Sequence, residues 1–273
     1  MNVTRRTFGL GALGLAASLA ACGGSGTDDS GSATADASSE ITLVTEGTLT
    51  VASDLAYPPL ETTNADTGEA EGFSIDMMDA IAQKLGLELE YLPAQKFDTI
   101  IPLIKQGGKA DVGVASFTIT DERLEEIDFS DPYMDSNQSI VVASDFGYTS
   151  TDDLDSADIK VAVQSGTTGE EWVKENLPNA QCVPLDDLVQ CFTGVQSGLY
   201  QAIVADLPPC SYMCTNSYTD LEVVESIPTG EQYGIVVSKD NPALTAAIND
   251  ALAELEADGT IAELEVKWFG DEL

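Results

Sequence analysis

The chain has no histidine, which removes several classes of function at once. Without imidazole it cannot build a Ser-His-Asp or Cys-His nucleophile system, nor imidazole ligands for zinc or haem. We therefore expect no catalytic residues of these classes, no metal site and no cofactor. Basic residues are also scarce, with 11 lysines and arginines against 47 aspartates and glutamates and a net charge of −36. Such a surface repels phosphates, which argues against nucleic acid as a partner.

The apolar run from residue 8 to 21 is too short for a membrane span. It follows Thr4-Arg5-Arg6-Thr7-Phe8, a segment similar to twin-arginine export signals. We interpret residues 1–21 as a secretory signal peptide. Paired arginines are common in such signals, so the general secretory route and the twin-arginine route both stay open.

The segment Leu19-Ala20-Ala21-Cys22 resembles a lipobox, after which bacterial lipoproteins carry acyl chains on the cysteine. Residues 22–46 are rich in small and polar residues, which predicts a flexible tether. Several acyl chains on Cys22 would anchor the protein to the outer face of the bacterial cell membrane without a spanning helix. The alternative is a stray cysteine beside an ordinary cleavage site.

Four further cysteines lie in one region of the chain. An even number in an oxidising compartment suggests disulfides, although four cysteines allow three pairings. The irregular spacing and the missing histidine make a metal site the weaker alternative. These residues are Cys182, Cys191, Cys210 and Cys214.

Strand and helix patterns alternate after the tether. A strand is predicted at 48–52, and apolar residues recur at helical spacing from 75 to 85. Ser74 is predicted to cap this helix and Gly86 to end it. A strand at 87–91, a helix at 98–106 and a strand at 111–115 follow. The alternation predicts α/β units with helices packed on a sheet.

A second series of elements begins near residue 140, which predicts a second α/β lobe with a ligand crevice between the two. Its last part returns to a strand and two amphipathic helices separated by Gly259. The predicted strands and helices before that return are 139–143, 159–163, 169–176, 182–184 and 203–204.

Arginine is used at only one position once Arg5 and Arg6 leave with the signal peptide. Arg123 closes a segment that follows a predicted strand and contains the hydroxyls of Ser116 and Thr118. The planar guanidinium binds a carboxylate through two parallel hydrogen bonds, which lysine cannot do. The segment therefore suggests a carboxylate site, with a surface ion pair as the alternative.

An opposite partner lies on a different strand. Asp206 follows the apolar strand at 202–205, at the carboxyl end where ligands gather in α/β sheets. The turn at 164–169 opens a helix, and its amides and hydroxyls suit an anionic group. Together with Arg123 these features describe a site for a zwitterion.

From about Gly47 to Leu273 the chain resembles the polar amino-acid-binding proteins of ABC importers, solute-binding protein family 3. Ser74 departs from the family, which has an acid there. The resemblance implies a two-lobed α/β fold of the periplasmic-binding-protein type II, each lobe a mixed sheet flanked by helices. It rests on the segments Ser53-Asp54-Leu55-Ala56-Tyr57-Pro58-Pro59, Gly72-Phe73-Ser74-Ile75-Asp76, Phe117 to Arg123, Asp128-Phe129-Ser130-Asp131-Pro132-Tyr133, Ser165-Gly166-Thr167-Thr168, Gln232-Tyr233-Gly234 and Lys267-Trp268-Phe269-Gly270.

The resemblance also implies a division of the chain. The first lobe would comprise residues 47–132 and 234–273, and the second residues 138–228. Residues 133–137 and 229–233 would be the two hinge strands.

By the same resemblance, Arg123 would hold the ligand α-carboxylate, helped by the Thr118 hydroxyl, the region of Ser116, and Thr168. Asp206 would accept the α-ammonium. Two aromatic residues would flank the ligand side chain, an aspartate would meet its distal polar group, and a glutamine would vary with specificity. The predicted ligand-binding residues are Asp54, Tyr57, Phe97, Ala115, Ser116, Thr118, Arg123, Gln164, Thr167, Thr168 and Asp206.

The function implied is binding of a free amino acid and its delivery to an ABC permease by a monomeric, lipid-anchored receptor. Asp54 beside aromatic rings favours a distal donor, as in glutamine, arginine, lysine or histidine. Cystine or a smaller polar amino acid remains open. The alternatives are an amino-acid sensor and a dehydratase acting on cyclic acids, in which a carboxylate such as Glu61 would transfer protons.

Overall fold

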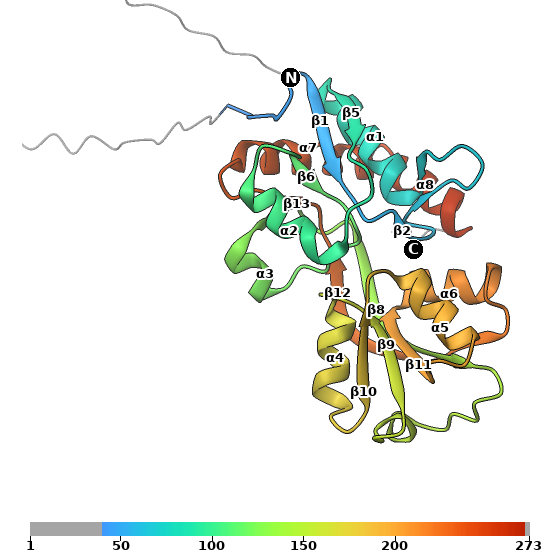
Figure 1. Cartoon of the computed structure of the whole chain (residues 1–273). Helices are drawn as coiled ribbons and strands as arrows, with labels where there is room; N and C mark the ends of the chain where they lie inside the picture. Colours follow the sequence, from blue (N-terminus) through green and yellow to red (C-terminus); the bar gives the residue numbers. More distant parts are fainter. Residues whose placement is uncertain (1–39, 271–273) are drawn as a thin grey trace, which may run out of the picture. The chain divides into compact units, whose positions relative to one another are not determined.

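The structure is a computed structural model that describes residues 40–270. The predicted signal peptide, the lipobox with Cys22 and most of the predicted tether lie outside these residues. The described part has two five-stranded mixed sheets flanked by helices and one small three-stranded sheet (Figure 1). The predicted two-lobed α/β fold is confirmed. Within the described part, no helix has both the length and the apolar character needed to cross a membrane.

The first sheet forms the core of what we call the first lobe. Its strands are ordered β5 (Glu88–Tyr91), β1 (Thr48–Ala52), β6 (Val112–Gly113), β13 (Val236–Val237) and β7 (Asp128–Phe129). β1 pairs in parallel with β5 and β6, whereas β13 runs antiparallel to β6 and β7. β1 matches its prediction, whereas the strand predicted at 111–115 is shorter.

The second sheet forms the core of the second lobe. Its strands are ordered β10 (Gln181–Leu185), β9 (Lys160–Gln164), β11 (Ala202–Asp206), β8 (Met134–Ala143) and β12 (Leu221–Tyr233). β9 pairs in parallel with β10 and β11, and β8 runs antiparallel to β11 and β12. The predicted hinge stretches are therefore the paired ends of two long strands.

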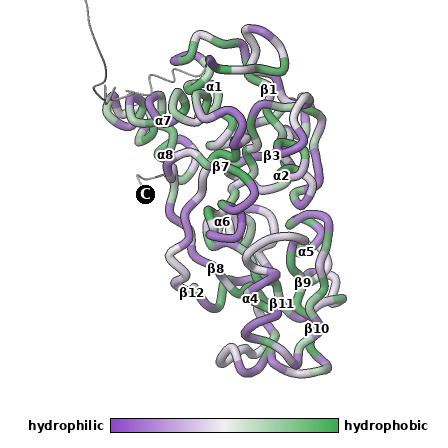
Figure 2. Tube along the Cα trace, turned by 90° about the vertical axis from the view of Figure 1, so that its left-hand side faces the viewer, coloured by the Kyte–Doolittle hydropathy of each residue, from purple (hydrophilic) through white to green (hydrophobic). Residues whose placement is uncertain are grey.

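Helices cover the sheets and bury their apolar residues against them (Figure 2). In the first lobe, α1 packs on α7 and α8. In the second lobe, α4 and α5 contact β9 and β11, and α6 contacts β8 and β12. The helices are α1 (Phe73–Leu85), α2 (Phe97–Gln106), α3 (Asp121–Glu126), α4 (Thr168–Asn176), α5 (Leu188–Gln196), α6 (Leu207–Asn216), α7 (Pro242–Ala257) and α8 (Thr260–Phe269), with a 3₁₀ turn at Thr151–Leu154.

The start of α1 corrects one prediction. The cap residue is Gly72, and Ser74 lies inside the helix with a buried hydroxyl. Gly72 has φ 140°, and a Cβ there would lie 2.1 Å from the carbonyl oxygen of Leu60. Only glycine fits this approach to the turn before β3, so the helix begins without a side-chain cap. The predicted end at Gly86 is confirmed by its left-handed φ of 69°.

The small sheet joins β2 (Ala56–Tyr57), β3 (Glu61–Thr63) and β4 (Ala70–Glu71) in antiparallel pairs. No strand is predicted for these residues from the sequence pattern.

No disulfide joins any of the four cysteines of the described part. Cys191 and Cys210 are buried free thiols, so the expected disulfides are absent from the described part.

Candidate functional site

A small cavity lies between the two lobes. Ten of the eleven predicted ligand-binding residues line it, although their roles toward a ligand stay predictions. Asp54, the eleventh, is hydrogen-bonded to one of the ten. The lining residues are Tyr57, Phe97, Ala115, Ser116, Thr118, Arg123, Gln164, Thr167, Thr168 and Asp206.

The loop after β6 brings backbone and hydroxyl groups to the cavity. Ser116 has a φ of 49°, in the left-handed region that residues other than glycine rarely adopt. Its hydroxyl donates to the Glu61 Oε1 at 2.7 Å, and this buried bond holds the unusual backbone in place. Strained backbone of this kind is concentrated at functional sites.

Arg123 lies in the first turn of α3, whose cap residue Thr120 accepts its backbone N–H at 3.2 Å. The guanidinium donates to the Thr118 carbonyl at 2.7 Å and, across the lobes, to the Gly166 carbonyl at 3.0 Å. It also lies over the rings of Phe97 and Phe117, 5.6 and 5.8 Å from their centres. These contacts fix the direction in which the planar cation can meet a ligand carboxylate.

Asp206 ends β11 on the opposite lobe and is only 6% exposed. Its carboxylate accepts from the Tyr233 hydroxyl at 2.7 Å and from the Gln138 amide nitrogen at 2.5 Å. Burial nevertheless raises the pKa of Asp206 to about 6, and the charge of Glu231 contributes to the rise. The site therefore holds an acid that would gain from a cationic partner.

Asp54 follows β1 and meets Gln164, the last residue of β9, across the lobes. The Gln164 amide donates to the Asp54 Oδ2 at 2.9 Å. Burial raises the pKa of Asp54 to about 6, and its Oδ1 has no hydrogen-bond partner in the structure. The Gln164 Oε1 is likewise unpartnered, so both side chains keep unused acceptors.

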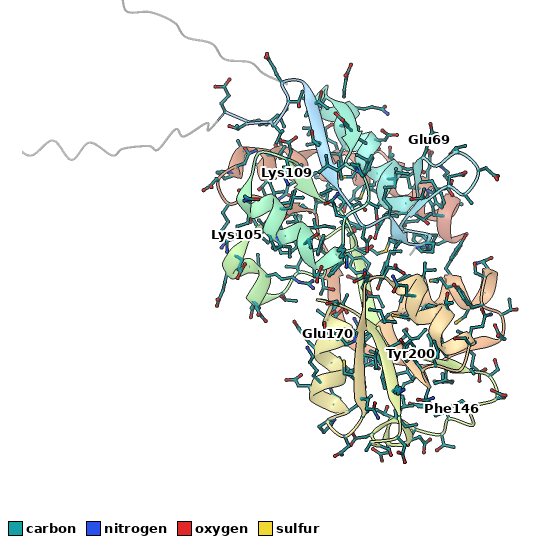
Figure 3. The ribbon with its side chains drawn as sticks, in the orientation of Figure 1. Glu69, Lys105, Lys109, Phe146, Glu170 and Tyr200 are labelled. Atoms are coloured by element: carbon teal, nitrogen blue, oxygen red, sulfur yellow. The ribbon has the colours of Figure 1, made fainter. Side chains whose placement is uncertain are left out.

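The turn after β9 begins α4, as predicted. Thr167 caps the helix, accepting the Glu170 N–H at 3.2 Å while its hydroxyl donates to the Gln164 carbonyl at 2.8 Å. The Gly166 N–H donates to the Glu170 carboxylate at 2.7 Å, and Figure 3 shows Glu170 on α4. Glu170 thus already accepts from one of the backbone N–H groups that were expected to bind an anion.

Two aromatic residues, Tyr57 and Phe97, line the cavity. Phe97 begins α2 and stacks on Phe117 with ring centres 4.5 Å apart. Tyr57 lies on β2, 5% exposed, and burial together with the charge of Asp206 raises the pKa of its hydroxyl. Both are therefore core residues as well as cavity walls.

Two polar residues of the paired strands β8 and β12, neither of which was predicted as ligand-binding, bond to side chains that line the cavity. The Gln138 amide nitrogen lies within hydrogen-bonding distance of Asp206, Thr168 and Glu231, which share its two protons. Glu231 also accepts from the hydroxyls of Thr118 and Thr168. The sequence indicated only that Gln138 and Glu231 lie in or beside the predicted hinge strands. The alternation of side chains along a strand does not identify which residues face a cleft.

Glu61 lies behind the cavity wall rather than in it. It is fully buried, and burial raises its pKa to about 8, helped by the charge of Asp54. Its carboxylate accepts a hydrogen bond from the Ser116 hydroxyl. Among residues 40–270, no group of three or more acids and cysteines is placed to hold a metal ion.

Comparison with known proteins places this geometry in a family. The model of the bacterial extracellular solute-binding proteins, family 3, matches residues 49–271. The L-cystine-binding protein TcyJ of Escherichia coli (strain K12) is 32% identical, over 82% of this chain and 83% of TcyJ. The ABC transporter glutamine-binding protein GlnH of Bacillus subtilis (strain 168) is 32% identical, over 77% of this chain and 76% of GlnH.

Among solved structures, an ancestral arginine-binding protein bound to glutamine superposes with a TM-score of 0.76 at 38% identity. The match covers 83% of this chain and all of that one. With nearly the whole described part matched in both comparisons, the chain belongs to the bacterial extracellular solute-binding proteins, family 3.

Proposed function

We propose that this protein is the amino-acid-binding component of an ABC importer, which closes its lobes on a free polar amino acid and delivers it to a permease. One observation carries the proposal. An arginine of the first lobe and a buried aspartate of the second line the same cavity.

The two ends of a zwitterion fit these two residues. The α-carboxylate would bind Arg123, whose guanidinium is already oriented by backbone carbonyls. The α-ammonium would bind Asp206, whose buried charge lacks a cation. Because each end contacts a different lobe, ligand binds the closed form better than the open form and shifts the equilibrium toward closure.

The ligand side chain would extend toward Asp54 and Gln164. Once Arg123 and Asp206 have paired with the α-groups, Asp54 remains as an unpaired buried acid with a free oxygen. A basic side chain would neutralise it, and an amide would donate to it. Relatives named for arginine and glutamine support a basic or amidic ligand.

The sequence supports lipid attachment at Cys22 and a position on the outer face of the bacterial cell membrane. Processing at the lipobox would remove residues 1–21 and leave a tethered monomer. Mass spectrometry of the protein from its native membrane, with Cys22→Ser as control, tests this part separately.

A thermal-shift screen of the unlipidated mature chain, residues 23–273, tests the function. The ligands are the common amino acids and cystine. A ligand at a hundredfold excess over its dissociation constant adds about 2.7 kcal/mol to the free energy of unfolding. A clear shift with one basic or amidic amino acid is expected. No shift with any amino acid would contradict the proposal, and cyclic carboxylic acids would be tested next.

A further inference from the structure

The carboxylate of Glu231 lies where the two lobes meet the cavity. Glu231 belongs to β12, close to where Tyr233 pairs with the backbone of Thr118. Its Oε2 accepts from the Thr118 hydroxyl of the first lobe at 3.3 Å and from the Thr168 hydroxyl of the second at 3.1 Å. The Gln138 amide nitrogen adds a third bond at 2.9 Å.

These hydrogen bonds determine whether the Thr118 and Thr168 hydroxyls donate or accept toward other partners. A threonine hydroxyl has one proton and two lone pairs, and a carboxylate can only accept. Thr118 and Thr168 therefore give their protons to Glu231 and present only lone pairs to other partners. The Thr168 hydroxyl also lies 3.1 Å from the Gln138 amide nitrogen, whose two protons are shared among Thr168, Asp206 and Glu231.

The cavity consequently combines two kinds of hydrogen-bonding group. Arg123 presents donors, whereas Asp206, Thr118 and Thr168 present acceptors. An α-ammonium has three N–H groups to donate. This differs from the role suggested by the family resemblance, in which the Thr118 hydroxyl helps to bind the α-carboxylate.

We propose that Glu231 is a positioning residue that sets the specificity of this site for an α-ammonium group, by holding the Thr118 and Thr168 hydroxyls as acceptors. The inference rests on the proposed amino-acid-binding function and names the group that the site selects. An α-hydroxy acid donates once where an ammonium donates three times. It would leave buried acceptors unpaired, which is costly.

Glu231→Gln tests this with little change in shape. The amide can donate to both threonines, which releases their protons toward the ligand. The variant should lose affinity for the amino acid and tolerate the hydroxy acid better. A residue that merely steadies the two strands would affect both ligands equally, so the ratio of the two affinities is the informative quantity.

The experiment is isothermal titration calorimetry on the unlipidated mature chain. The probes are L-arginine and L-glutamine, each paired with the analogue in which a hydroxyl replaces the α-amino group. Glu231→Gln should reduce the preference for the amino acid by about 10- to 100-fold, the range for hydrogen bonds to a charged group. Glu225→Gln is the matched control, because Glu225 lies on the same strand and contacts Tyr148 and Thr151 instead of the cavity.

An unchanged preference in Glu231→Gln would overturn the inference, even with weaker binding of both probes. If that variant fails to fold by circular dichroism, Thr118→Val replaces it. Losing one acceptor should then reduce the preference for the amino acid, and an unchanged ratio would again overturn the inference. Wild-type protein that binds neither these probes nor any other amino acid would instead contradict the proposed function.

Discussion

The two lobes share one sheet plan and use it for different chemistry. Each sheet has three parallel strands, of which the first in the chain lies between the second and the third, and an antiparallel strand lies beyond the third. That antiparallel strand, β13 or β8, comes from the part of the chain that crosses between the lobes. The plan therefore places the carboxyl ends of equivalent strands at the cavity from both sides.

Equivalent strands supply complementary groups. The first strands, β1 and β9, lead to Asp54 and end in Gln164, which bond to each other. The third strands, β6 and β11, lead to Arg123 and end in Asp206, the two groups proposed to hold the α-carboxylate and the α-ammonium. The first strands thus form the side-chain end of the site and the third strands its zwitterion end.

The largest effect should come from breaking the zwitterion end. Arg123→Ala and Asp206→Ala should each weaken amino-acid binding by roughly 2–5 kcal/mol, the range for truncating one partner of a buried pair. Arg123→Lys should recover little, because lysine lacks the planar fork. Calorimetry measures the affinities, and wild-type affinity in either alanine variant would refute the site assignment.

Buried acids are distributed unevenly between the lobes. Of the described residues, Asp54, Glu61 and Asp111 are buried acids of the first lobe, against Asp206 in the second. Asp111 accepts two backbone N–H groups, whereas Glu61 has one hydroxyl donor. Glu61, like Asp54, accepts from one side chain, and burial raises the pKa of Glu61 further, to about 8.

Replacing Glu61 should change how the free energy of unfolding depends on pH. The folded chain raises the pKa of Glu61 from 4.5 to about 8, so the folded state holds a proton that the unfolded state loses. As pH rises from about 4.5 to about 8, the contribution of Glu61 to the free energy of unfolding falls. Glu61→Gln keeps the shape without titrating, so its stability relative to wild type should rise by a few kcal/mol across this window, since a tenfold change in protonation is worth about 1.4 kcal/mol.

Urea unfolding at several pH values measures this, with Glu88→Gln, an exposed residue of β5, as control. A stability difference between Glu61→Gln and wild type that stays constant with pH would show that Glu61 does not titrate in this window.

The sequence predicted much of this arrangement because strand ends are local features. Arg123 and Asp206 each follow a short apolar strand, and a sheet brings such ends to one edge. Ten predicted residues accordingly line one cavity. The family resemblance supplied Tyr57 and Phe97, which by their chemistry alone are ordinary core aromatics.

Other features depend on contacts between distant segments. Gly72 replaces Ser74 as the cap because of the Leu60 carbonyl, which belongs to a neighbouring turn. The bonds of Glu231 to Thr118 and Thr168 join residues 113 and 63 positions apart in the chain. No periodicity reports such pairs, so the hydrogen-bond polarity of the cavity emerged only from the structure.

The side-chain end of the site should show a smaller and more selective effect. Asp54→Asn removes the charge but keeps a hydrogen-bonding group near Gln164. Arginine binding should weaken by about 1.5–3 kcal/mol, the range for a hydrogen bond to a charged group, while glutamine binding changes less. Equal losses for both ligands in calorimetry would show that Asp54 acts on lobe closure rather than on the ligand side chain.

The smallest expected effect concerns an ion pair at the protein surface, where the two lobes meet through solvent-exposed charges. Lys96 of the first lobe pairs with Asp186 of the second at 2.8 Å, and both side chains are more than half exposed. Lys105, labelled in Figure 3, pairs with Glu126 at 3.1 Å within the first lobe. The two pairs have similar exposure, but of these two only the first joins the lobes.

Lys96→Ala should therefore weaken ligand binding by about 0.2–1 kcal/mol, the range for an exposed pair, and Lys105→Ala should leave it unchanged. The effect of Lys96→Ala should shrink at high salt, because exposed charges are screened. Calorimetry at two salt concentrations measures both variants. Equal losses of ligand affinity in the two variants would mean that net charge, and not the ion pair between the lobes, sets the affinity. A loss confined to Lys96→Ala would show that closure of the lobes contributes part of the binding energy.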